Sequence, residues 1–393
     1  MRICLVGYSF YESDNRTMRY ATTLAQRGDS VDVFALRRDG FAPFEVLDGV
    51  NVYRIQDRRV NEMGRLTYLL RIVRFLLRSA YVVTRRHLAN PYQLVHVHSV
   101  PDFMVFAALV PKLLGARVIL DIHDILPEFY GSKFGVGPRS VQFKLLALLE
   151  KVSAGFADHV IIANDLWKER IVARSVPERK CTALCNYPDL RIFHPQSKMT
   201  RNGKFVILYP GSLNIHQGLD VALRAFAQIA NQIPDADFHI YGEGPQRTAL
   251  VALAKDLGLD GRVQFHGVLP IREIAGVMAS SDLAIVPKRA SSFGNEAAST
   301  KIMEFMALGV PVIVSRTKVD SYYFDDSVVR FFEPENENDL AKSILELRRD
   351  SRLRERLTTN AARYIRRTNW DTKKIEYLRL VDTLTRTEAA TAA

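Results

Sequence analysis

The sequence predicts an α/β protein built from two doubly wound parallel sheets, one in each of two domains. The chain has 393 residues, which is more than one hydrophobic core normally organises. Ten short apolar runs alternate with helical patterns, and such runs are typical of parallel strands that helices cover on both faces. A polar stretch at 194–204 separates the first five runs from the last five. We therefore expect domains at 1–195 and 196–370.

Each apolar run is expected to form one strand. Ligands of parallel α/β sheets bind at the carboxyl ends of the strands, so the residues that follow the runs are the candidates for function. The runs are RICLVGY (2–8), SVDVFAL (30–36), LVHVHSV (94–100), ARVILDI (116–122), HVIIA (159–163), KFVILYP (204–210), DFHIYG (237–242), RVQFHG (262–267), LAIVP (283–287) and VPVIVS (310–315).

Composition and charge limit the kinds of binding partner and the cellular location that we expect for the protein. The formal net charge of +11 is compatible with a nucleic acid, an anionic membrane or a phosphorylated substrate, and also with a merely solvated basic surface. The three cysteines, Cys4, Cys181 and Cys185, are too few for a disulfide framework and lie in no spacing typical of zinc. No apolar run is long enough to span a bilayer, and the start predicts a strand rather than a secretory signal. These features favour a cytoplasmic protein.

The turn after the run at 204–210 has glycines suited to phosphate binding. Gly211 and Gly218 permit a tight turn and a close backbone approach, and a helix is expected to begin near Gly218. A helix start presents free N–H groups and the positive end of the helix dipole to an anion. Many strand-to-helix turns need glycine for other reasons, however. The similar turn at Gly242 and Gly244 lacks the dinucleotide-binding spacing, and we interpret it as mainly structural.

The stretch EAASTKIMEFMALGVPVI at 296–313 places two glutamates around a helix start. Glu296 ends a loop, the helix is expected to begin near Thr300, and Glu304 lies one turn inside it. The amides of the helix start and Lys301 would hold a diphosphate, Glu304 would accept hydrogen bonds from a ribose, and Glu296 would face a sugar. From the spacing alone, a capped helix with two solvated glutamates remains an equal interpretation.

This stretch also carries a family resemblance. The E-x7-E spacing of Glu296 and Glu304, followed by Gly-Val-Pro-Val, resembles the signature of family 4 glycosyltransferases of the GT-B fold. The segments YGEGPQRTALVALAKDLGLDGRVQFHG and FADHVIIANDL resemble other common segments of that family, so the resemblance covers nearly the whole chain. It implies that Glu296 contacts the donor sugar and Glu304 the nucleotide ribose. It also implies retention of the anomeric configuration, no essential metal or other cofactor, and a last helix, about 371–388, that returns to the first domain.

Two positions depart from the family pattern. Ser212 and Gln217 stand where the family often has the Arg and Lys that hold the diphosphate. Lys301, Lys288 and Arg289 are the available replacement cations, while Ser212 and Gln217 could still donate hydrogen bonds. The departure resembles a subgroup with an HQGLD-like turn, which favours an active protein.

Candidates for the acceptor and the reacting centre follow strands of the first half. His123 and Asp124 come directly after the run at 116–122, and the resemblance implies that His123 contacts the transferred sugar or the acceptor. A histidine that only caps the next helix is the alternative. His98 lies near a strand end, whereas His96 is expected to be a satisfied buried histidine. Asp14 and Arg16 precede the first helix and are candidates to contact an acceptor phosphate.

Positive charge is concentrated at 64–87, which contains six arginines and no acidic residue. Arg71, Arg74, Arg78 and Arg85 share one helical face with Tyr68, Phe75 and Val82 beside them, and Leu66, Leu70, Val73 and Leu77 form another stripe. This pattern fits an interfacial helix, at 65–86, that packs inward on one side and meets anionic lipid on the other. An ordinary amphipathic helix with a solvated basic face fits equally well. No recognition motif supports a nucleic-acid partner.

We therefore expect a two-domain GT-B enzyme that transfers a sugar from a nucleotide-diphosphate sugar to an acceptor. The basic helix favours a lipid-linked saccharide as acceptor, used at the cytoplasmic face of a membrane during polysaccharide assembly. Two alternatives remain open. One is a sugar-nucleotide epimerase of the same fold, and the other is a catalytically silent, membrane-associated binding protein.

Overall fold

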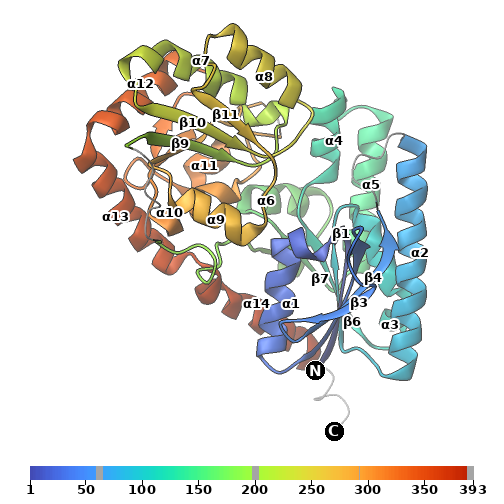
Figure 1. The fold of residues 1–393 in the computed structure, drawn as a ribbon. Helices are drawn as coiled ribbons and strands as arrows, with labels where there is room; N and C mark the ends of the chain where they lie inside the picture. The colour runs from blue at the N-terminus through green and yellow to red at the C-terminus, as the bar shows by residue number, and fades with distance from the viewer. Residues whose placement is uncertain (59–64, 197–202, 292, 387–393) are drawn as a thin grey trace. The chain divides into compact units, whose positions relative to one another are not determined.

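The chain folds into two compact units (Figure 1). The computed structural model describes residues 1–58, 65–196, 203–291 and 293–386. One unit comprises Met1–Asn186 and Lys374–Ala393, and the other Tyr187–Lys373. The linker expected at 194–204 lies within the second unit, and its residues 197–202 are outside the described part of the chain. Helix α14 (Trp370–Arg386) begins in the second unit and ends in the first.

The first unit is organised around an eight-stranded sheet with the order β3-β4-β2-β1-β5-β6-β7-β8. All neighbouring strands are parallel except the antiparallel pair β3 and β4. The order reverses between β1 and β5, and such a reversal is where doubly wound sheets bind ligands. The strands are β1 (Arg2–Phe10), β2 (Ser30–Arg37), β3 (Phe44–Leu47), β4 (Val50–Asp57), β5 (Leu94–His98), β6 (Arg117–Ile122), β7 (His159–Ile162) and β8 (Cys181–Ala183).

Helices cover both faces of this sheet (Figure 1). On one face α2, α3 and α5 pack around the short helix η2, and α4 packs against α5. On the other face α1 lies beside the last turns of α14, where Arg27 forms an ion pair with Asp382 (2.8 Å). The helices are η1 (Tyr11–Ser13), α1 (Asn15–Gln26), α2 (Arg65–Ala89), η2 (Asp102–Ala108), α3 (Leu109–Leu113), α4 (Leu126–Phe134), α5 (Val141–Phe156), α6 (Asp165–Arg174) and η3 (Glu178–Lys180).

Helix α2 packs differently from the sequence prediction. Its buried face carries Ile72, Phe75, Ser79 and Val83, whereas Leu70, Val73 and Leu77, predicted to pack inward, are exposed. Two arginines of α2 contact strand β4, whereas Arg74 and Arg85 are exposed. Arg78 donates a hydrogen bond to the Ile55 carbonyl of β4 (3.0 Å), and Arg86 lies over the Tyr53 ring (3.9 Å). No helix in the described ranges is long and apolar enough to cross a bilayer.

The second unit contains a six-stranded parallel sheet with the order β11-β10-β9-β12-β13-β14. Counted within the unit, this is the order 3-2-1-4-5-6 of doubly wound nucleotide-binding sheets, with the reversal between β9 and β12. The strands are β9 (Phe205–Pro210), β10 (Ala236–Tyr241), β11 (Val263–His266), β12 (Leu283–Val286), β13 (Val312–Ser315) and β14 (Arg330–Phe332).

The core of the second unit lies between this sheet and its helices. The rings of Phe226 of α7 and Phe238 of β10 pack at a tilt, with their centres 6.0 Å apart, and Ile207 and Ile285 of the central strands are fully buried in the same cluster. The helices are η4 (Ile215–Gln217), α7 (Leu219–Ile229), η5 (Ala230–Gln232), α8 (Arg247–Asp256), α9 (Ile271–Ala279), α10 (Thr300–Leu308), α11 (Lys318–Tyr323), α12 (Glu337–Arg349) and α13 (Ser351–Arg367).

All ten apolar runs form strands, and four further strands within the described ranges carry no such run. Strands β3, β8 and β14 are short and lie at sheet edges. Strand β4 alternates buried and half-exposed residues, and its buried positions include Arg54 and Gln56. Arg54 is neutralised there by Glu12 and Glu45. A buried polar pattern of this kind cannot be distinguished from a loop by hydrophobicity.

Candidate functional site

Two segments meet at the reversal point of the second unit, namely the turn after β9 and the loop after β12. The Arg289 amide donates a hydrogen bond to the His216 carbonyl (2.9 Å). Gly218 has a φ of +66° and caps α7, and a Cβ built on it would lie 2.0 Å from the Pro287 carbonyl oxygen. Only glycine therefore allows the two backbones to approach this closely.

Lys301 lies directly over this turn. A Cβ on Gly211 would lie 2.2 Å from the Lys301 Cε, and the Lys301 ammonium sits 5.4 Å from the centre of the Tyr209 ring. Burial lowers the pKa of Lys301 to about 8, although the nearby Glu304 carboxylate partly opposes that change. Burial thus disfavours the charged form of Lys301, and an anionic ligand bound at the glycine turn would stabilise the ammonium.

The other two candidate cations are already neutralised. The Lys288 ammonium lies 2.8 Å from Asp320 and donates to the Ala297 carbonyl (2.7 Å). Arg289 pairs with Asp220 (2.5 Å) and with Glu335 (3.2 Å). Among the described residues no carboxylate lies within ion-pair distance of Lys301. The structure therefore favours Lys301 as the diphosphate cation and does not support that role for Lys288 or Arg289.

The turn itself is electropositive despite Ser212 and Gln217. Burial lowers the pKa of His216, and the charges of Lys301 and Lys288 lower it further. The Gln217 side-chain nitrogen lies 3.1 Å from the His216 ring, and its buried carbonyl oxygen has no hydrogen-bond partner in the described ranges. Ser212 is exposed, and its backbone carbonyl accepts a hydrogen bond from the Tyr209 hydroxyl (2.9 Å).

Helix α10 begins at Thr300, as the sequence predicts, and ends at Gly309 in the left-handed conformation. Ser299 precedes the helix without capping it, and its buried hydroxyl has no partner in the described part of the chain. Glu304 lies one turn inside the helix and is partly exposed. Glu296 is only 7% exposed, with the Lys318 ammonium 3.6 Å from its carboxylate. The interpretation of two solvated glutamates is therefore wrong for Glu296.

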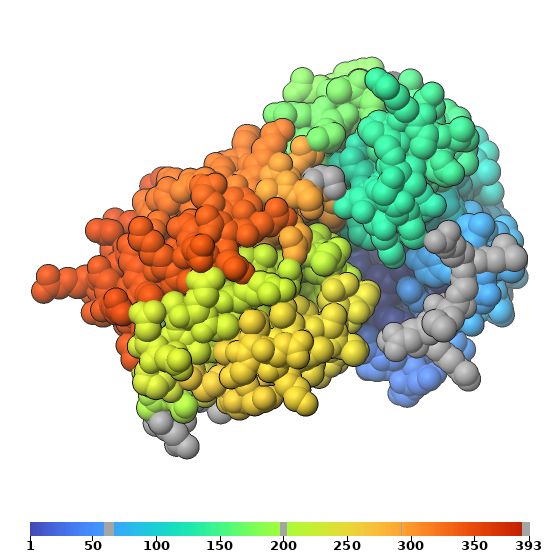
Figure 2. Space-filling view, turned by 90° about the horizontal axis from the view of Figure 1, so that it is seen from above, coloured from blue at the N-terminus to red at the C-terminus, as the bar shows by residue number. Residues whose placement is uncertain are grey.

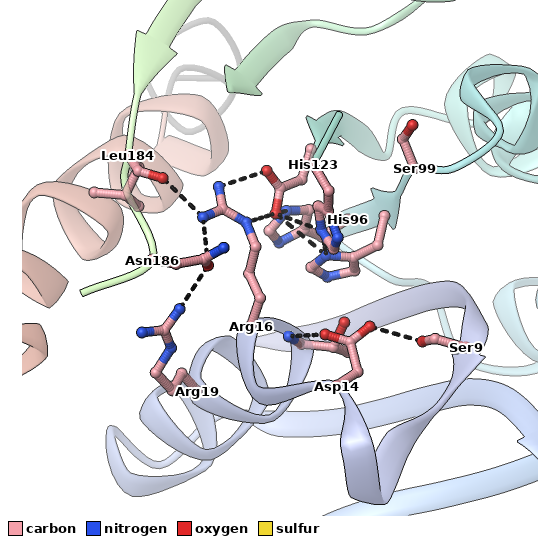
Figure 3. Close-up of polar contacts among 12 residues, drawn as sticks. Ser9, Asp14, Arg16, Arg19, His96, Ser99, His123, Leu184 and Asn186 are labelled. Carbon is pink, nitrogen blue, oxygen red and sulfur yellow. Dashed lines mark hydrogen bonds and ion pairs between the residues drawn. The ribbon is translucent and has the colours of Figure 1, made fainter. Parts of the chain in front are cut away.

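The first unit gathers a second polar cluster at the carboxyl ends of β5 and β6 (Figure 3). Asp121 of β6 is fully buried, and Arg16 donates to both of its oxygens, each at 2.7 Å. Arg16 also donates to the Leu184 carbonyl (2.7 Å) and to Asn186 (3.0 Å). The guanidinium is thus buried and donates four hydrogen bonds inside the fold. The structure does not support the predicted role of Arg16 in binding an acceptor phosphate.

Two histidines share the same carboxylate. The ring nitrogens of His98 and His123 each lie 3.3 Å from Asp121 and 3.2 Å from one another. Burial alone would raise the pKa of Asp121, but the charge of Arg16, followed by His123, holds it well below its ordinary value. Burial lowers the pKa of His98, whereas the His123 side chain remains 23% exposed. His123 is therefore the member of the pair that a ligand can reach.

His96 lies deeper on the same strand. Its Nδ1 lies 3.0 Å from the Tyr377 hydroxyl of α14, and its ring stacks on His98 with the centres 4.4 Å apart. Burial lowers the pKa of His96 well below its ordinary value, so the ring is neutral. The predicted burial of His96 is confirmed, but its Nε2 lacks a hydrogen-bond partner among the described residues and lies 4.0 Å from Asp121, so the histidine is not fully satisfied.

The ligand atoms of His96, His98 and Asp121 lie within 4.8 Å of one another, a spacing that a metal ion could bridge. The donor set does not fit a cation, however, because both oxygens of Asp121 already accept hydrogen bonds from the Arg16 guanidinium. A second positive charge against that guanidinium would be repelled. We interpret the group as a hydrogen-bonded ion-pair cluster.

Asp14 and Asp124 flank this cluster. Asp14 caps α1 by accepting hydrogen bonds from the Thr17 amide (3.0 Å) and the Ser9 hydroxyl (2.7 Å). Burial alone would raise its pKa, but His123 and His98 hold the pKa of Asp14 below its ordinary value. Burial raises the pKa of Asp124, which His123 partly opposes. Both carboxyl groups thus lie within electrostatic reach of His123.

Comparison with known proteins places the chain in a family. Residues 13–187 match the glycosyl transferase 4-like domain, and residues 191–364 match the glycosyl transferases group 1. The chain belongs to the family 4 glycosyltransferases. The subgroup suggested by the HQGLD-like turn stays a prediction.

Solved structures show that this family 4 glycosyltransferase has the GT-B fold. Sucrose-phosphate synthase from Thermosynechococcus elongatus superposes with a TM-score of 0.78 at 18% identity, over 98% of this chain and 99% of that one. The Anabaena protein HepE, solved in complex with UDP-glucose, has a TM-score of 0.69 at 16% identity, over 100% and 99% of the two chains.

One sequence relative of this glycosyltransferase is a GDP-mannose-dependent α-(1-6)-phosphatidylinositol dimannoside mannosyltransferase of Mycobacterium tuberculosis. It is 32% identical over 211 residues, which are 52% of this chain and 52% of the relative. The match thus spans about half the length of that relative.

Several residues around the candidate sites of this glycosyltransferase were not identified by the sequence analysis. Asp121, Asn186 and Lys318 contact candidate residues, and Tyr377 contacts the buried His96. Asp121 alone had a usable signal, because an acidic residue inside the apolar run ARVILDI must find a buried partner. The others contact residues that are distant in sequence and carry no local pattern.

Proposed function

We propose that the protein is a retaining glycosyltransferase that moves a sugar from a nucleotide-diphosphate sugar onto a lipid-linked saccharide in polysaccharide assembly. The observation that carries the proposal is the Lys301 ammonium, which lies over the Gly211 turn without a carboxylate partner in the described ranges. HepE was solved with UDP-glucose, and the mycobacterial relative is named for a GDP-mannose donor and a phosphatidylinositol acceptor. These names support a nucleotide-sugar donor and a lipid acceptor.

In this proposal the second unit binds the donor. Lys301, the amides at the start of α10 and the turn at 211–218 hold the diphosphate, and they stabilise the negative charge that develops on it as the sugar leaves. Glu304 accepts hydrogen bonds from the ribose hydroxyls, and Glu296 from the transferred sugar. The proposal needs no metal or other cofactor, because the leaving group is neutralised by these donors.

The first unit contributes to the reacting centre. Asp121 and the neutral His98 fix the ring of His123, whose exposed edge contacts the transferred sugar or the acceptor. Asp14 and Asp124 lie near that edge and are candidates to position the acceptor hydroxyl. The departing phosphate takes the acceptor proton on the face that it leaves, which accounts for retention without a covalent nucleophile.

The proposal is tested by incubating the full chain with UDP- and GDP-sugars, with and without a polyprenyl-diphosphate-linked saccharide. We expect labelled sugar to move onto the lipid only when both substrates are present, with the anomeric configuration retained in the product. Conversion of the donor sugar in the absence of acceptor would instead identify an epimerase. Donor binding without any turnover, under all conditions, would identify a binding protein.

Replacing Glu304 with Ala should weaken nucleotide binding by about 1.5–3 kcal/mol, the range for a hydrogen bond to a charged group. The motivation is its place one turn inside α10, behind the amides that face the diphosphate. Calorimetric titration with UDP or GDP measures the change. Glu273→Ala, at an exposed glutamate in the first turn of α9, is the matched control and should bind like the parent. Equal affinities for both variants would remove the ribose assignment.

A further inference from the structure

Helix α5 exposes a row of apolar side chains. Val141, Leu145, Leu148 and Val152 are 78%, 63%, 57% and 51% exposed. Their spacing of four, three and four residues places them on one stripe, while Glu150, Ser153 and Ala154 form the buried side of the helix. Soluble monomers rarely expose contiguous apolar surface of this kind unless it binds something.

Helices α2 and α3 extend this apolar surface on the same face of the sheet. Leu77 and Tyr81 of α2 are 65% and 66% exposed, Leu113 at the end of α3 is 77% exposed, and Leu114, which follows it, is 55% exposed. Both α2 and α5 pack against η2, and α3 packs against α2, so all three cover one side of the first unit. Figure 2 shows α4 and α5 at the surface of this unit with α2 beside them.

The charges on the exposed faces of α2 and α5 are positive, and the acids beside α2 and α3, Asp57 and Asp158, pair with Arg37 and Lys112. Lys144 and Lys151 are exposed beside the α5 stripe, and Arg74 and Arg85 are exposed on α2. Helix α2 contains no acidic residue, and the only acid of α5, Glu150, is fully buried against Arg174 (2.6 Å). An apolar stripe with a cationic border matches the interface of an anionic bilayer. A second copy of this chain would bring two positive faces together, which disfavours self-association.

We propose that α2, α3 and α5 form one membrane-docking face. The exposed leucines and valines lie in the acyl boundary of the bilayer, and the lysines and arginines lie at the level of anionic phospholipid headgroups. This inference deepens the proposed function, in which the acceptor is a lipid, and it revises the predicted mode of binding. The leucine stripe of α2 enters the membrane together with α5, a helix that was not predicted to contact lipid.

The experiment is co-sedimentation of the full chain with phosphatidylcholine vesicles, with and without phosphatidylglycerol, at low and high salt. We expect binding to the anionic vesicles that weakens with salt. The double variants Leu145→Gln with Leu148→Gln, and Lys144→Gln with Lys151→Gln, should each lower the partition coefficient at least about tenfold. The matched controls are Val251→Gln with Val268→Gln and Lys255→Gln with Lys342→Gln, all exposed in the second unit, and they should bind like the parent.

The proposal is overturned if the parent fails to bind anionic vesicles, binds neutral ones equally, or loses no affinity through the α5 changes. It is also overturned if the parent is a dimer that Leu145→Gln with Leu148→Gln converts to a monomer, since the face would then join two copies. Melting temperatures near that of the parent would show that the variants are folded. Donor consumption with a soluble acceptor, measured in parallel, tests the proposed function independently of vesicle binding.

Discussion

Replacing Lys301 with Ala should lower the turnover by about 100-fold or more, the range found when one preorganised donor to a developing negative charge is removed. The reason is that Lys301 alone, among the three candidate cations, has no carboxylate within ion-pair distance in the described ranges. Steady-state transfer rates at saturating donor measure the change. Lys255→Ala, an exposed lysine of α8, is the matched control and should leave turnover near that of the parent.

The same lysine should make donor binding dependent on pH. Burial lowers the pKa of the free Lys301 to about 8, and a bound diphosphate would raise it again by stabilising the ammonium. Nucleotide affinity should therefore be level below about pH 8 and fall above it, by at most about tenfold per pH unit. Lys301→Arg should restore part of the turnover and remove this fall, because arginine stays protonated. If nucleotide affinity still falls above about pH 8 in Lys301→Arg, the pH dependence belongs to another group.

Lys288→Ala is not a useful comparison for Lys301→Ala. Lys288 forms a buried ion pair with Asp320, and removing one partner of such a pair commonly costs about 3–5 kcal/mol of stability. A lower turnover in that variant would therefore report damage to the fold. Ranking of the cations by activity is informative only with melting temperatures measured beside it.

Replacing Asp121 with Ala should lower the free energy of unfolding of the first unit by about 3–5 kcal/mol. The substitution leaves the Arg16 guanidinium buried without a counter-charge, since Leu184 and Asn186 offer only neutral acceptors. Urea denaturation followed by Trp167 fluorescence reports this unit once the second tryptophan is removed by Trp370→Phe. The same background serves for all variants, so its own effect cancels.

Two further variants separate a buried ion pair from an ordinary loss of contacts. Arg16→Met combined with Asp121→Leu should recover much of the lost stability, because replacing both partners leaves no unpaired charge. Asp57→Ala removes the carboxylate of an exposed pair with Arg37 and should unfold like the parent. If Asp121→Ala and Asp57→Ala have the same free energy of unfolding, the buried pair of Arg16 and Asp121 does not stabilise the first unit as we expect.

The Asp121 contribution should also depend on pH in a defined direction. Its folded pKa lies well below the ordinary value near 4, so the carboxylate stabilises the fold above that value. This contribution is fully present above about pH 5 and is lost as the pH falls through the acidic range. The double variant Arg16→Met with Asp121→Leu should lack this part of the acid dependence.

Ten of the strands in the described ranges, and the helix start that bears the E-x7-E spacing, could be predicted from local sequence. Strands such as RICLVGY and LAIVP are buried on both faces, so their composition alone identifies them. The start of α10 at Thr300 and its end at Gly309 follow from local hydrogen-bonding and φ preferences that act within a few residues. Strand β4 escaped detection because its buried positions include Arg54 and Gln56.

Which charged side chains remain available to a ligand could not be predicted from local sequence. The sequence predicts that Arg16 binds an anion. In the structure its guanidinium is instead paired with Asp121, which lies 105 positions away in the chain. Arg289 is likewise neutralised by Asp220, and α2 buries Ile72 and Phe75 while its leucine stripe is exposed. Such outcomes depend on which elements pack together, and the free energy of a charge depends on its burial and its partners rather than on its neighbours along the chain.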